Sequence, residues 1–482
     1  MMDDRPRPLC VDLDGTLIQT DLLIESVLVL LKRNPFWLFV LPLWLFKGKA
    51  HFKQQIAQRV ELDVTRLPFN QPLLAYLRDQ QTQGRRLVLA TAANQRYAEQ
   101  IACHLGLFEA ILASDAEINL SGTRKRDRLV ELFGASGFDY AGNSISDLRV
   151  WSHARKAIVV NASAPLARHV AGMAEVERII PAPAISLRTY LKALRVHQWV
   201  KNALVFVPLL AAHQIFNPTL LLQTALAFLA FGLCASSVYV LNDLLDLAAD
   251  RAHPTKCRRP FAAGLIPIQQ GLWLIPSLLT LAFLLALWLP FWLSVTLGLY
   301  YLLTLAYSLR LKQWVLIVVL TLAGLYTLRI GAGGAATGIP LSFWLLALSL
   351  FLFLSLALAK RYAELQLCYA DGRDFAAGRG YRTADLETLA QFGIVSGYLS
   401  ALVLALYIDS ADVMALYTEP SLLWLACPLL LYWISRVWLL ARRGALHEDP
   451  VVFALTDPVS YTVFALVAGC VWLASSSLTG LV

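Results

Sequence analysis

The chain has 482 residues, of which 58% are hydrophobic and only 15% are charged, so its composition favours an integral membrane protein over a soluble enzyme. Lysine and arginine (41) outnumber aspartate and glutamate (33), giving a net charge of +8. In a membrane protein this excess indicates cytoplasmic loops and anionic lipid or phosphate partners, and we expect no nucleic-acid partner. The seven cysteines show no CxxC or paired spacing, so neither disulfides nor a zinc site is predicted.

Residues 1–180 are predicted to form a soluble α/β domain with a parallel, doubly wound sheet, because short apolar runs alternate with helical stretches. In such sheets the chemistry lies at the carboxyl ends of the strands, where Asp12, Asp14 and Thr91 fall. The four predicted strands lie in PLCVDLDGTL (8–17), RRLVLATAAN (85–94), FDYAGNSISD (138–147) and KAIVVN (156–161).

The polar motifs of this domain resemble those of the haloacid dehalogenase (HAD) superfamily of phosphatases. They are the DxDGT run from Asp12 to Thr16, Thr91 after the second strand, Lys125 in GTRKRD, and GNSISD at 142–147. The resemblance implies that Asp12 is a phosphate-accepting nucleophile and Asp14 a general acid and base. It also implies that Thr91 and Lys125 hold the phosphoryl oxygens, and that Mg²⁺ is bound by Asp12, Asp14 and Asp147.

One position departs from that pattern. Asn143 stands where the family usually has an acidic residue, and an amide supplies an oxygen but no charge. Weaker metal binding would follow, which leaves open a degenerate, structural domain beside the preferred interpretation of a working phosphatase.

An insertion at about 21–75 is predicted to be a helical cap. It contains the apolar run FWLFVLPLWLF (36–46), flanked by Lys32, Arg33, Lys47 and Lys49. Eleven residues are too few to cross a hydrocarbon core of about 30 Å. The run either packs into the domain core, which is the preferred interpretation, or rests on the membrane surface or the membrane domain through its basic flanks.

After a proline-containing linker at 181–188 (PAPAISLR), residues 189–482 are predicted to form an all-α membrane domain of nine transmembrane helices. Alternate loops carry the lysines and arginines, so the N-terminal domain is expected in the cytoplasm and the C-terminus outside, in a bacterium across the inner (plasma) membrane. The spans are 200–213 (beginning earlier, near Leu191), 218–242, 268–289, 291–309, 313–332, 341–360, 386–408, 420–441 and 459–479.

The second span ends in YVLNDLLDLAADRAHPTKCRRPFAAG (239–264), which places Asn242, Asp243, Asp246 and Asp250 on one helix face. Carboxylates so arranged repel one another unless a divalent cation lies between them, and oxygen ligands suit Mg²⁺ with substrate phosphates. A solvated acidic helix end is the alternative. It fits less well, because apolar residues precede the cluster for more than twenty positions.

Further polar residues fall at the same, cytoplasmic level of the predicted spans. A single basic residue there is an orientation signal, whereas Arg258 with Arg259 and Lys360 with Arg361 are better explained as phosphate binders. Arg329 lies within a span, where a charge is costly, and either function or a structural pairing explains it. The others are Arg195, Gln198, Lys201, Asn202, Tyr307, Ser308, Lys312, Tyr362, Glu364, Asp449 and Asp457.

Three motifs of residues 188–480 resemble the UbiA superfamily of intramembrane prenyltransferases: RVHQWVKN (195–202), NDLLDLAAD (242–250) and AKRYAELQ (359–366). They are most similar to the branch that contains decaprenyl-phosphate phosphoribosyltransferase. The resemblance implies a nine-helix bundle with a cavity open to lipid. It also implies transfer of phosphoribose from phosphoribosyl pyrophosphate to a polyprenyl phosphate, in cell wall biosynthesis. Val318 stands where an acidic residue often follows the Lys312 motif.

The residues after the sixth span favour this branch over an aromatic prenyltransferase, because a cation pair replaces the second aspartate cluster that a prenyl diphosphate usually needs. We expect Asn242, Asp243, Asp246 and Asp250 to hold Mg²⁺ on the pyrophosphate of the donor. Substrate contacts are expected from Lys201, Asn202, Arg258, Arg259, Lys312, Lys360, Arg361, Tyr362 and Glu364. The HAD-like domain is then expected to remove the 5-phosphate of the product.

Two alternatives remain. The first is a UbiA-type enzyme that moves a prenyl group from a prenyl diphosphate to an aromatic or other small acceptor. The second is a lipid or metabolite transporter with a regulatory domain, which is disfavoured because polar residues concentrate on one face.

Overall fold

The computed structural model describes residues 7–375, 380–410, 413, 416–446, 450–454 and 456–475. The chain forms two compact units. The N-terminal unit contains the residues up to Leu194 together with Tyr239–Ile275, and the helical unit contains Arg195–Val238 and the residues from Pro276 onward. The stretch that carries the aspartate motif therefore belongs to the N-terminal unit.

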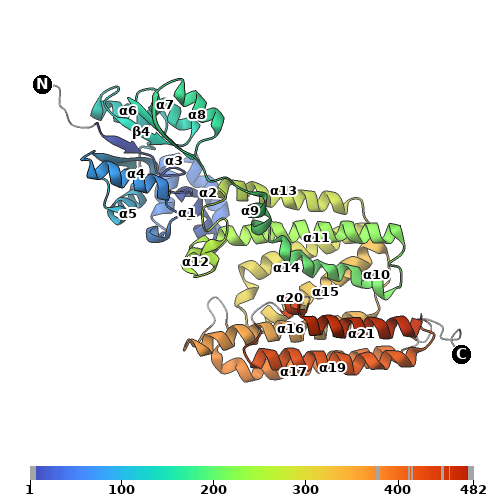
Figure 1. Ribbon diagram of the computed structural model, residues 1–482. Helices are drawn as coiled ribbons and strands as arrows, with labels where there is room; N and C mark the ends of the chain where they lie inside the picture. Colours follow the sequence, from blue (N-terminus) through green and yellow to red (C-terminus); the bar gives the residue numbers. More distant parts are fainter. Residues whose placement is uncertain are drawn as a thin grey trace. The chain divides into compact units, whose positions relative to one another are not determined.

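A six-stranded, fully parallel sheet forms the centre of the N-terminal unit, in the order β3-β2-β1-β4-β5-β6 (Figure 1). The four predicted strands are all present, and the sheet confirms the predicted doubly wound α/β class. The two further strands, β3 and β6, lie at the edges. The strands are β1 (Leu9–Val11), β2 (Leu87–Asn94), β3 (Ala110–Ser114), β4 (Asp139–Gly142), β5 (Lys156–Val160) and β6 (Glu175–Ile180).

Helices cover both faces of the sheet, so the central strand β1 is wholly buried. Leu9 and Val11 point to one apolar cluster and Cys10 to the other, as the alternation of a strand requires. The first cluster is closed by α4 (Gln71–Thr82) and α5 (Gln95–Leu105), and the second by α6 (Thr123–Phe133), α7 (Leu148–Trp151) and α8 (Ala164–Ala171).

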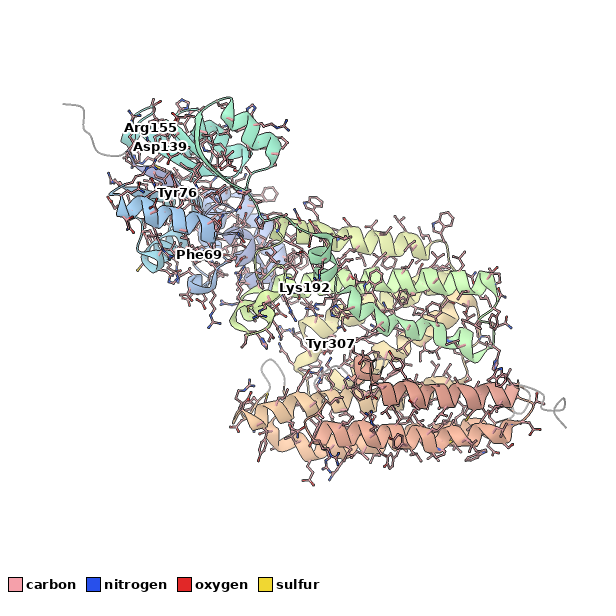
Figure 2. The ribbon with its side chains drawn as sticks, viewed as in Figure 1. Phe69, Tyr76, Asp139, Arg155, Lys192 and Tyr307 are labelled. Atoms are coloured by element: carbon pink, nitrogen blue, oxygen red, sulfur yellow. The ribbon has the colours of Figure 1, made fainter. Side chains whose placement is uncertain are left out.

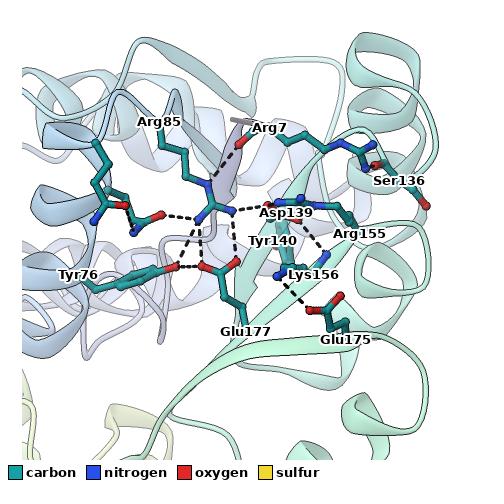
Figure 3. A network of polar contacts seen from close by, with 12 residues as sticks. Arg7, Tyr76, Arg85, Ser136, Asp139, Tyr140, Arg155, Lys156, Glu175 and Glu177 are labelled. Atoms are coloured by element: carbon teal, nitrogen blue, oxygen red, sulfur yellow. Dashed lines mark hydrogen bonds and ion pairs between the residues drawn. The ribbon is translucent and has the colours of Figure 1, made fainter. Parts of the chain in front are cut away.

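A buried ion network ties together the residues where β2 and β4 begin (Figure 3). The Asp139 carboxylate is completely buried and accepts from Arg85 and, at 3.0 and 2.5 Å, from Arg155. Arg85 also contacts Glu177 of β6 at 3.1 Å, and Tyr76 donates to that carboxylate. Of these residues, Tyr76, Asp139 and Arg155 are also marked in Figure 2. A buried carboxylate needs such partners, so the network is structural and lies at the opposite strand ends from Asp12.

The predicted cap consists of α1 (Leu22–Arg33), α2 (Trp37–Phe46), α3 (Lys49–Ala57) and a 3₁₀ turn, η1 (Val64–Arg66). Packing of the apolar run into the domain core, which the sequence favoured, is wrong: Leu41 is the single buried residue of α2. The helix is apolar on every side. Only the side that meets α1 and α3 is covered, so most of its large side chains stay exposed.

The end of α11 (Pro218–Leu245) packs on the cap within the N-terminal unit. Leu28 of α1 shares an apolar cluster with Val240, Leu244 and Phe261. The chain then continues through α12 (Leu247–Ala252) and a 3₁₀ turn, η4 (Lys256–Arg258). Helix α9 (Leu187–Ala193) begins within the predicted linker, and its Lys192, marked in Figure 2, donates to the carbonyl of Arg258 at 3.3 Å.

Eight helices among the described residues are long and apolar enough to cross a membrane, against nine predicted spans. The first predicted span instead forms a 3₁₀ stretch, η3 (Val196–Phe206), and the short α10 (Val207–Ala211). This segment lies very close to Gly333, where an added Cβ would come 2.1 Å from the carbonyl oxygen of Val205.

The other helices are α13 (Ile268–Ala286), α14 (Phe291–Leu309), α15 (Ile317–Thr337), α16 (Phe343–Ala370), α17 (Leu386–Ile408), α19 (Ala426–Arg442), α20 (Pro450–Ala454) and α21 (Pro458–Ser475), with turns η2 (Ile145–Asp147), η5 (Leu311–Gln313), η6 (Thr383–Asp385) and η7 (Pro420–Leu425).

Candidate active sites

The DxDGT loop leaves the carboxyl end of β1 in a conformation that only glycine adopts easily. Gly15 has φ +74°, and an added Cβ would come 2.1 Å from the amide nitrogen of Asn143. Nδ2 of Asn161, which follows β5, donates to the Gly15 carbonyl at 2.9 Å. The loops after β1, β4 and β5 therefore meet, as predicted for the carboxyl edge of a parallel sheet.

Asp12 is the first member of a buried polar chain. Its Oδ1 accepts from Nζ of Lys125 at 2.6 Å, and the same ammonium donates to the Tyr140 hydroxyl at 3.0 Å. That hydroxyl in turn donates to Asp147 Oδ1 at 2.8 Å. The sequence predicted Asp12, Lys125 and Asp147, and the structure brings them together. Tyr140 was missed, because a tyrosine within an apolar strand looks like a core residue.

The other oxygen of Asp147 holds the loop after β4. It accepts from the backbone N–H groups of Asn143 and Ser144 at 3.2 and 3.0 Å, and from the Ser144 hydroxyl at 2.7 Å. Asp147 does not line the cavity described below, whereas Asn143 does. In this state Asp147 positions Lys125 and the loop, and its predicted contact with Mg²⁺ stays a prediction.

Asp14 lies beside the first turn of α1, where its Oδ1 accepts from the backbone N–H of Leu22 at 3.0 Å. Burial, followed by repulsion from the Asp21 carboxylate, raises the pKa of Asp14 to about 8. Burial also raises the pKa of Asp12, but Lys125 opposes it and the value is about 6. Near neutral pH, Asp14 carries a proton and Asp12 does not. This is the division of roles expected for an acid and a nucleophile.

A lysine from the cap completes the site. Lys53 of α3 donates to the Ala92 carbonyl at 2.5 Å and to Asn119 Oδ1 at 2.7 Å, and it lines the same cavity as Asp12 and Asp14. The sequence did not single out Lys53, because lysines are frequent on cap surfaces and its partners lie far along the chain, in β2 and after β3. Thr91 is fully buried in β2, where its Oγ1 accepts from the Ala93 N–H at 2.9 Å.

Asp12, Asp14, Lys53, Lys125 and Asn143 line a cavity of about 480 Å³, and Thr91 is not part of its lining. One part of its wall comes from the segment that follows the aspartate motif, through Gly264, Leu265, Pro267 and Gln269. Gly264 has φ +70°, and an added Cβ would lie 2.9 Å from Cβ of Gln19. The phosphatase-like cavity is therefore built from both the HAD-like domain and the end of a membrane-domain segment.

The oxygen groups of this cavity fit a hard divalent cation. Asp12, Asp14 and Asn143 present carboxylate and amide oxygens to it, and the buried Oδ1 atom of half-buried Asn161 has no hydrogen-bond partner among the described residues. In the described part of the chain, no three His, Cys, Asp or Glu side chains converge as a preformed metal cluster. The set thus suits Mg²⁺, which retains several waters and needs few protein ligands.

The aspartate motif forms a second polar centre. Backbone bonds from Asp246 to Asn242 (2.9 Å) and from Asp250 to Asp246 (2.8 Å) keep the predicted helical register across the junction of α11 and α12. Nη1 of Arg259 contacts Asp243 at 3.2 Å and Asp250 at 2.7 Å, so two motif carboxylates converge on one positive group. That convergence fits a cation site. Arg259, predicted to bind phosphate, here neutralises the aspartates, and Arg258 is exposed.

The cap contacts this centre through two ion pairs. Lys32 of α1 lies 2.6 Å from Oδ1 of Asp246. Arg251 forms a bidentate pair with Glu25, at 2.9 and 2.6 Å, and both side chains are buried. Thr20 also donates to Glu25, and Arg251 donates to the Ala262 carbonyl at 3.0 Å. Sequence reasoning missed the Glu25–Arg251 pair, because its members are 226 positions apart.

In the helical unit, Arg329 is held by a structural pairing, one of the two explanations left open by the sequence. It donates to Asn202 Oδ1 at 2.9 Å, to the Tyr300 hydroxyl at 2.8 Å and to the Leu325 carbonyl at 2.7 Å. Lys201 is also buried and lies 6.0 Å from the Tyr326 ring. Nδ2 of Asn202 has no partner among the described residues, so this group retains donor capacity.

The cation pair after the predicted sixth span lies on α16. Arg361 is buried, pairs with Glu364 and contacts the hydroxyl of Tyr307, marked in Figure 2, at 3.4 Å. Lys360 is half-buried, and Tyr362 packs against Trp438. Lys312 lies in η5 and is half-buried, and Val318 is part of the apolar core. Asp457 pairs with Arg436 at 2.8 Å, whereas Asp449 lies outside the described residues.

Comparison with known families divides the chain in the same way as its motifs. Residues 203–456 match the UbiA prenyltransferase family. Residues 9–150 match the haloacid dehalogenase-like hydrolase family.

Relatives match over the whole chain or over its membrane part. Protein y4nM of Sinorhizobium fredii is 38% identical over 96% of this chain and 90% of its own length. Nodulation protein NoeC of Azorhizobium caulinodans is 35% identical over 61% of this chain and 95% of its own. Decaprenyl-phosphate phosphoribosyltransferase of Mycolicibacterium smegmatis is 38% identical over 38% of this chain, which spans 58% of that relative.

Solved structures resemble each part separately. A UbiA homolog from Archaeoglobus fulgidus bound to DMAPP and Mg²⁺ aligns with 59% of this chain and 99% of its own, at 17% identity and a TM-score of 0.46. A HAD family hydrolase from Salmonella enterica aligns with 36% of this chain and 68% of its own, at 15% identity and a TM-score of 0.28.

Proposed function

The chain belongs to the UbiA prenyltransferase family and carries an N-terminal HAD-like domain, and from that premise we propose that it is a two-step enzyme acting on a membrane lipid. The membrane domain transfers phosphoribose from phosphoribosyl pyrophosphate to a polyprenyl phosphate. The HAD-like domain then removes the 5-phosphate of the lipid-linked product. Both sites lie on the cytoplasmic side, with the C-terminus outside, in agreement with the basic loops.

The first step needs leaving-group stabilisation more than proton transfer. An oxygen of the lipid phosphate attacks the anomeric carbon of the donor, that carbon's bond to pyrophosphate breaks, and pyrophosphate leaves with the electron pair. Mg²⁺ supplies charge neutralisation of that leaving group when bound. Asp243 and Asp250, which converge on Arg259, suit this role together with Asn242 and Asp246. Substrate engagement would release Arg259 from the aspartates to bind phosphate oxygens.

Cationic side chains of the helical unit support an anionic acceptor. Buried Arg361 and half-buried Lys360 are suited to the lipid phosphate. Lys201, Asn202, Lys312, Tyr362 and Glu364 are proposed to complete the substrate contacts. Relatives that are 38–40% identical over this region are named decaprenyl-phosphate phosphoribosyltransferase, which supports a polyprenyl phosphate acceptor and transfer of a phosphoribosyl group.

The second step uses the Asp12 centre. An ionised Asp12 oxygen attacks the phosphorus, the bond to the ribose oxygen breaks, and Asp14 gives its proton to that oxygen. Water then hydrolyses the aspartyl phosphate and releases inorganic phosphate. Lys125, Lys53 and Thr91 would hold the phosphoryl oxygens. Mg²⁺, if held by oxygens of Asp12 and Asn143 beside the protonated Asp14, would supply further charge neutralisation.

One observation carries the coupling of the two steps. The cavity that contains Asp12, Asp14 and Lys125 is walled by residues 264–269, which follow the aspartate motif within the same compact unit. A wall supplied by this segment is expected if the second step acts on the product made at the motif, and a free sugar phosphate would not require it.

The proposal is tested by following a label from the donor into the lipid product and by measuring the mass of that product. The full chain in lipid nanodiscs receives polyprenyl phosphate and ribose-labelled phosphoribosyl pyrophosphate. We expect labelled ribosyl lipid and inorganic phosphate from the native chain, phosphoribosyl lipid from Asp12→Asn, and no labelled lipid from Asp246→Ala. Asp127→Asn, at an exposed carboxylate, serves as the control and should behave as the native chain.

Two results would contradict the proposal at different points. In a parallel reaction the chain receives a labelled prenyl diphosphate as donor. Transfer of that label to the product would show that the chain is an ordinary prenyltransferase. Phosphate release that persists in Asp12→Asn would remove the HAD-like domain from the pathway but leave the transfer step standing.

A further inference from the structure

The most exposed apolar surface of the N-terminal unit is α2 of the cap. Phe36, Phe39, Leu43 and Phe46 form a stripe with spacings of three, four and three residues, which places them along one side of the helix. Phe36, Phe39 and Phe46 are 73%, 72% and 88% exposed. Leu38 and Leu45, seven positions apart, lie beside this stripe and are also exposed. An apolar surface of this kind marks a docking site.

The opposite side of α2 packs against the other cap helices, α1 and α3, so the stripe faces away from them. The rings of Trp37 and Trp44 lie 5.2 Å apart, and the guanidinium of Arg59 is 5.6 and 4.8 Å from them. Leu41 is buried in the cluster that α2 shares with α1 and α3. The stripe is therefore held outward by packing on the other side and is not a loosely attached segment.

The charges around the stripe are positive, so they favour an anionic partner. Between Glu25 and Glu61 the chain has no acidic residue. Exposed Arg33 precedes α2, and exposed Lys47 and Lys49 follow it. An apolar helix with basic ends is the arrangement of helices that lie in the interface of a membrane with anionic lipids.

The length and attachment of α2 exclude a span and favour the membrane plane. Ten residues of helix reach only about 15 Å, which is half of a hydrocarbon core. Within the N-terminal unit, α1 packs on Val240 and Leu244, the last turns of the membrane-spanning candidate α11. The segment that leads into α2 is thus attached where the chain's own span ends.

We propose that α2 is a membrane-surface anchor, which inserts the stripe Phe36–Phe39–Leu43–Phe46 into the interface of an anionic bilayer and places Lys47 and Lys49 among lipid phosphates. This anchor holds the cap at the membrane independently of either catalytic step.

Depth-dependent quenching tests the anchor in the full chain. A polarity-sensitive dye is placed at Phe39→Cys or Phe46→Cys, and at Glu131→Cys of α6 as an exposed control, with labelling of the unsubstituted chain subtracted. Nanodiscs contain phosphatidylcholine alone or an equal mixture with phosphatidylglycerol, with or without lipid that carries a nitroxide near the headgroup. We expect several-fold quenching at both α2 positions in the anionic discs, weaker quenching in neutral discs or in Lys47→Glu/Lys49→Glu, and none at the control.

Each other outcome overturns the proposal. A label that iodide quenches but nitroxide lipid does not is in water. A label that neither quencher reaches is covered by protein, from this chain's helical unit or from a second copy. Equal lipid quenching in neutral and anionic discs would show that α2 inserts without any preference for anionic lipid.

Discussion

Replacing Arg251 by methionine should detach the segment after the aspartate motif from the cap. The change keeps an unbranched apolar stem but removes the guanidinium, which leaves the Glu25 carboxylate buried without its bidentate partner; both side chains of the pair are at most 7% exposed. Breaking a buried pair on one side costs about 3–5 kcal/mol. Because about 1.4 kcal/mol corresponds to a factor of ten, local opening of this contact should become about two to four orders of magnitude more frequent.

Hydrogen exchange with mass spectrometry on the full chain in nanodiscs measures this opening. Peptides that cover residues 251–269 and α1 should exchange faster in Arg251→Met, while peptides from β1 and β2 keep their protection. Arg128→Met is the matched control, because Arg128 forms a pair with Glu131 at 2.7 Å whose members are 48% and 66% exposed. That change should cost no more than about 1 kcal/mol.

The double variant Glu25→Leu/Arg251→Met decides between a pairing effect and a packing effect. It removes both charges together, so most of the protection should return even though no ion pair is restored. The reasoning is refuted if Arg251→Met exchanges no faster than Arg128→Met, or if the double variant is as unprotected as the single one.

Three further predictions concern the Asp12 cavity. Lys53→Met should lower kcat/KM for phosphate release by about ten- to a hundredfold through loss of a charged donor, with phosphoribosyl transfer unchanged. Exposed Arg128→Met is the control, and equal effects of the two changes would contradict the role of Lys53. Gly264→Ala should destabilise the unit by about 1–3 kcal/mol in thermal unfolding, since its φ is +70° and its Cβ would meet the cap, and by more than Gly84→Ala, whose φ is +77° in open space. Without divalent metal, the pKa of Asp14 rises from 3.8 to about 8 on folding, so the free energy of unfolding should fall as pH rises through that window. The pKa of Asp12 is also raised, to about 6, so Asp14→Asn should remove the part of this fall that lies above about pH 6, and a pH profile identical to that of the native chain would contradict it.

The predicted sheet illustrates which strands a sequence can reveal. The four strands found from sequence are the central ones, which are buried on both faces and read as continuous apolar runs. The edge strand β6 (EVERII) is mostly exposed and alternates polar residues, and β3 is only partly buried. Both strands exist because a neighbouring strand offers a hydrogen-bonding edge, which is a property of the fold and not of the local pattern.

The cap helix α2 shows what composition alone does not reveal. Composition located α2 and its basic flanks correctly, yet the preference for packing was wrong, because an all-apolar run gives no information on which side, if any, is covered. The first predicted span is a similar case. Its apolar residues are present, but close packing on Gly333 accompanies a 3₁₀ stretch and a short helix in place of one long helix.

The sequence by itself determined the two families, the DxDGT motif, the aspartate motif and the alternating basic loops, because these depend on residue type and on spacing within a single element. Only the tertiary structure decided that Tyr140 connects Lys125 to Asp147, that Lys53 enters the cavity, and that residues 264–269 form its wall. It likewise paired Glu25 with Arg251 and divided the aspartates between Lys32 and Arg259. Such contacts join residues tens to hundreds of positions apart, and no local pattern of residues encodes which distant charge will neutralise a buried one.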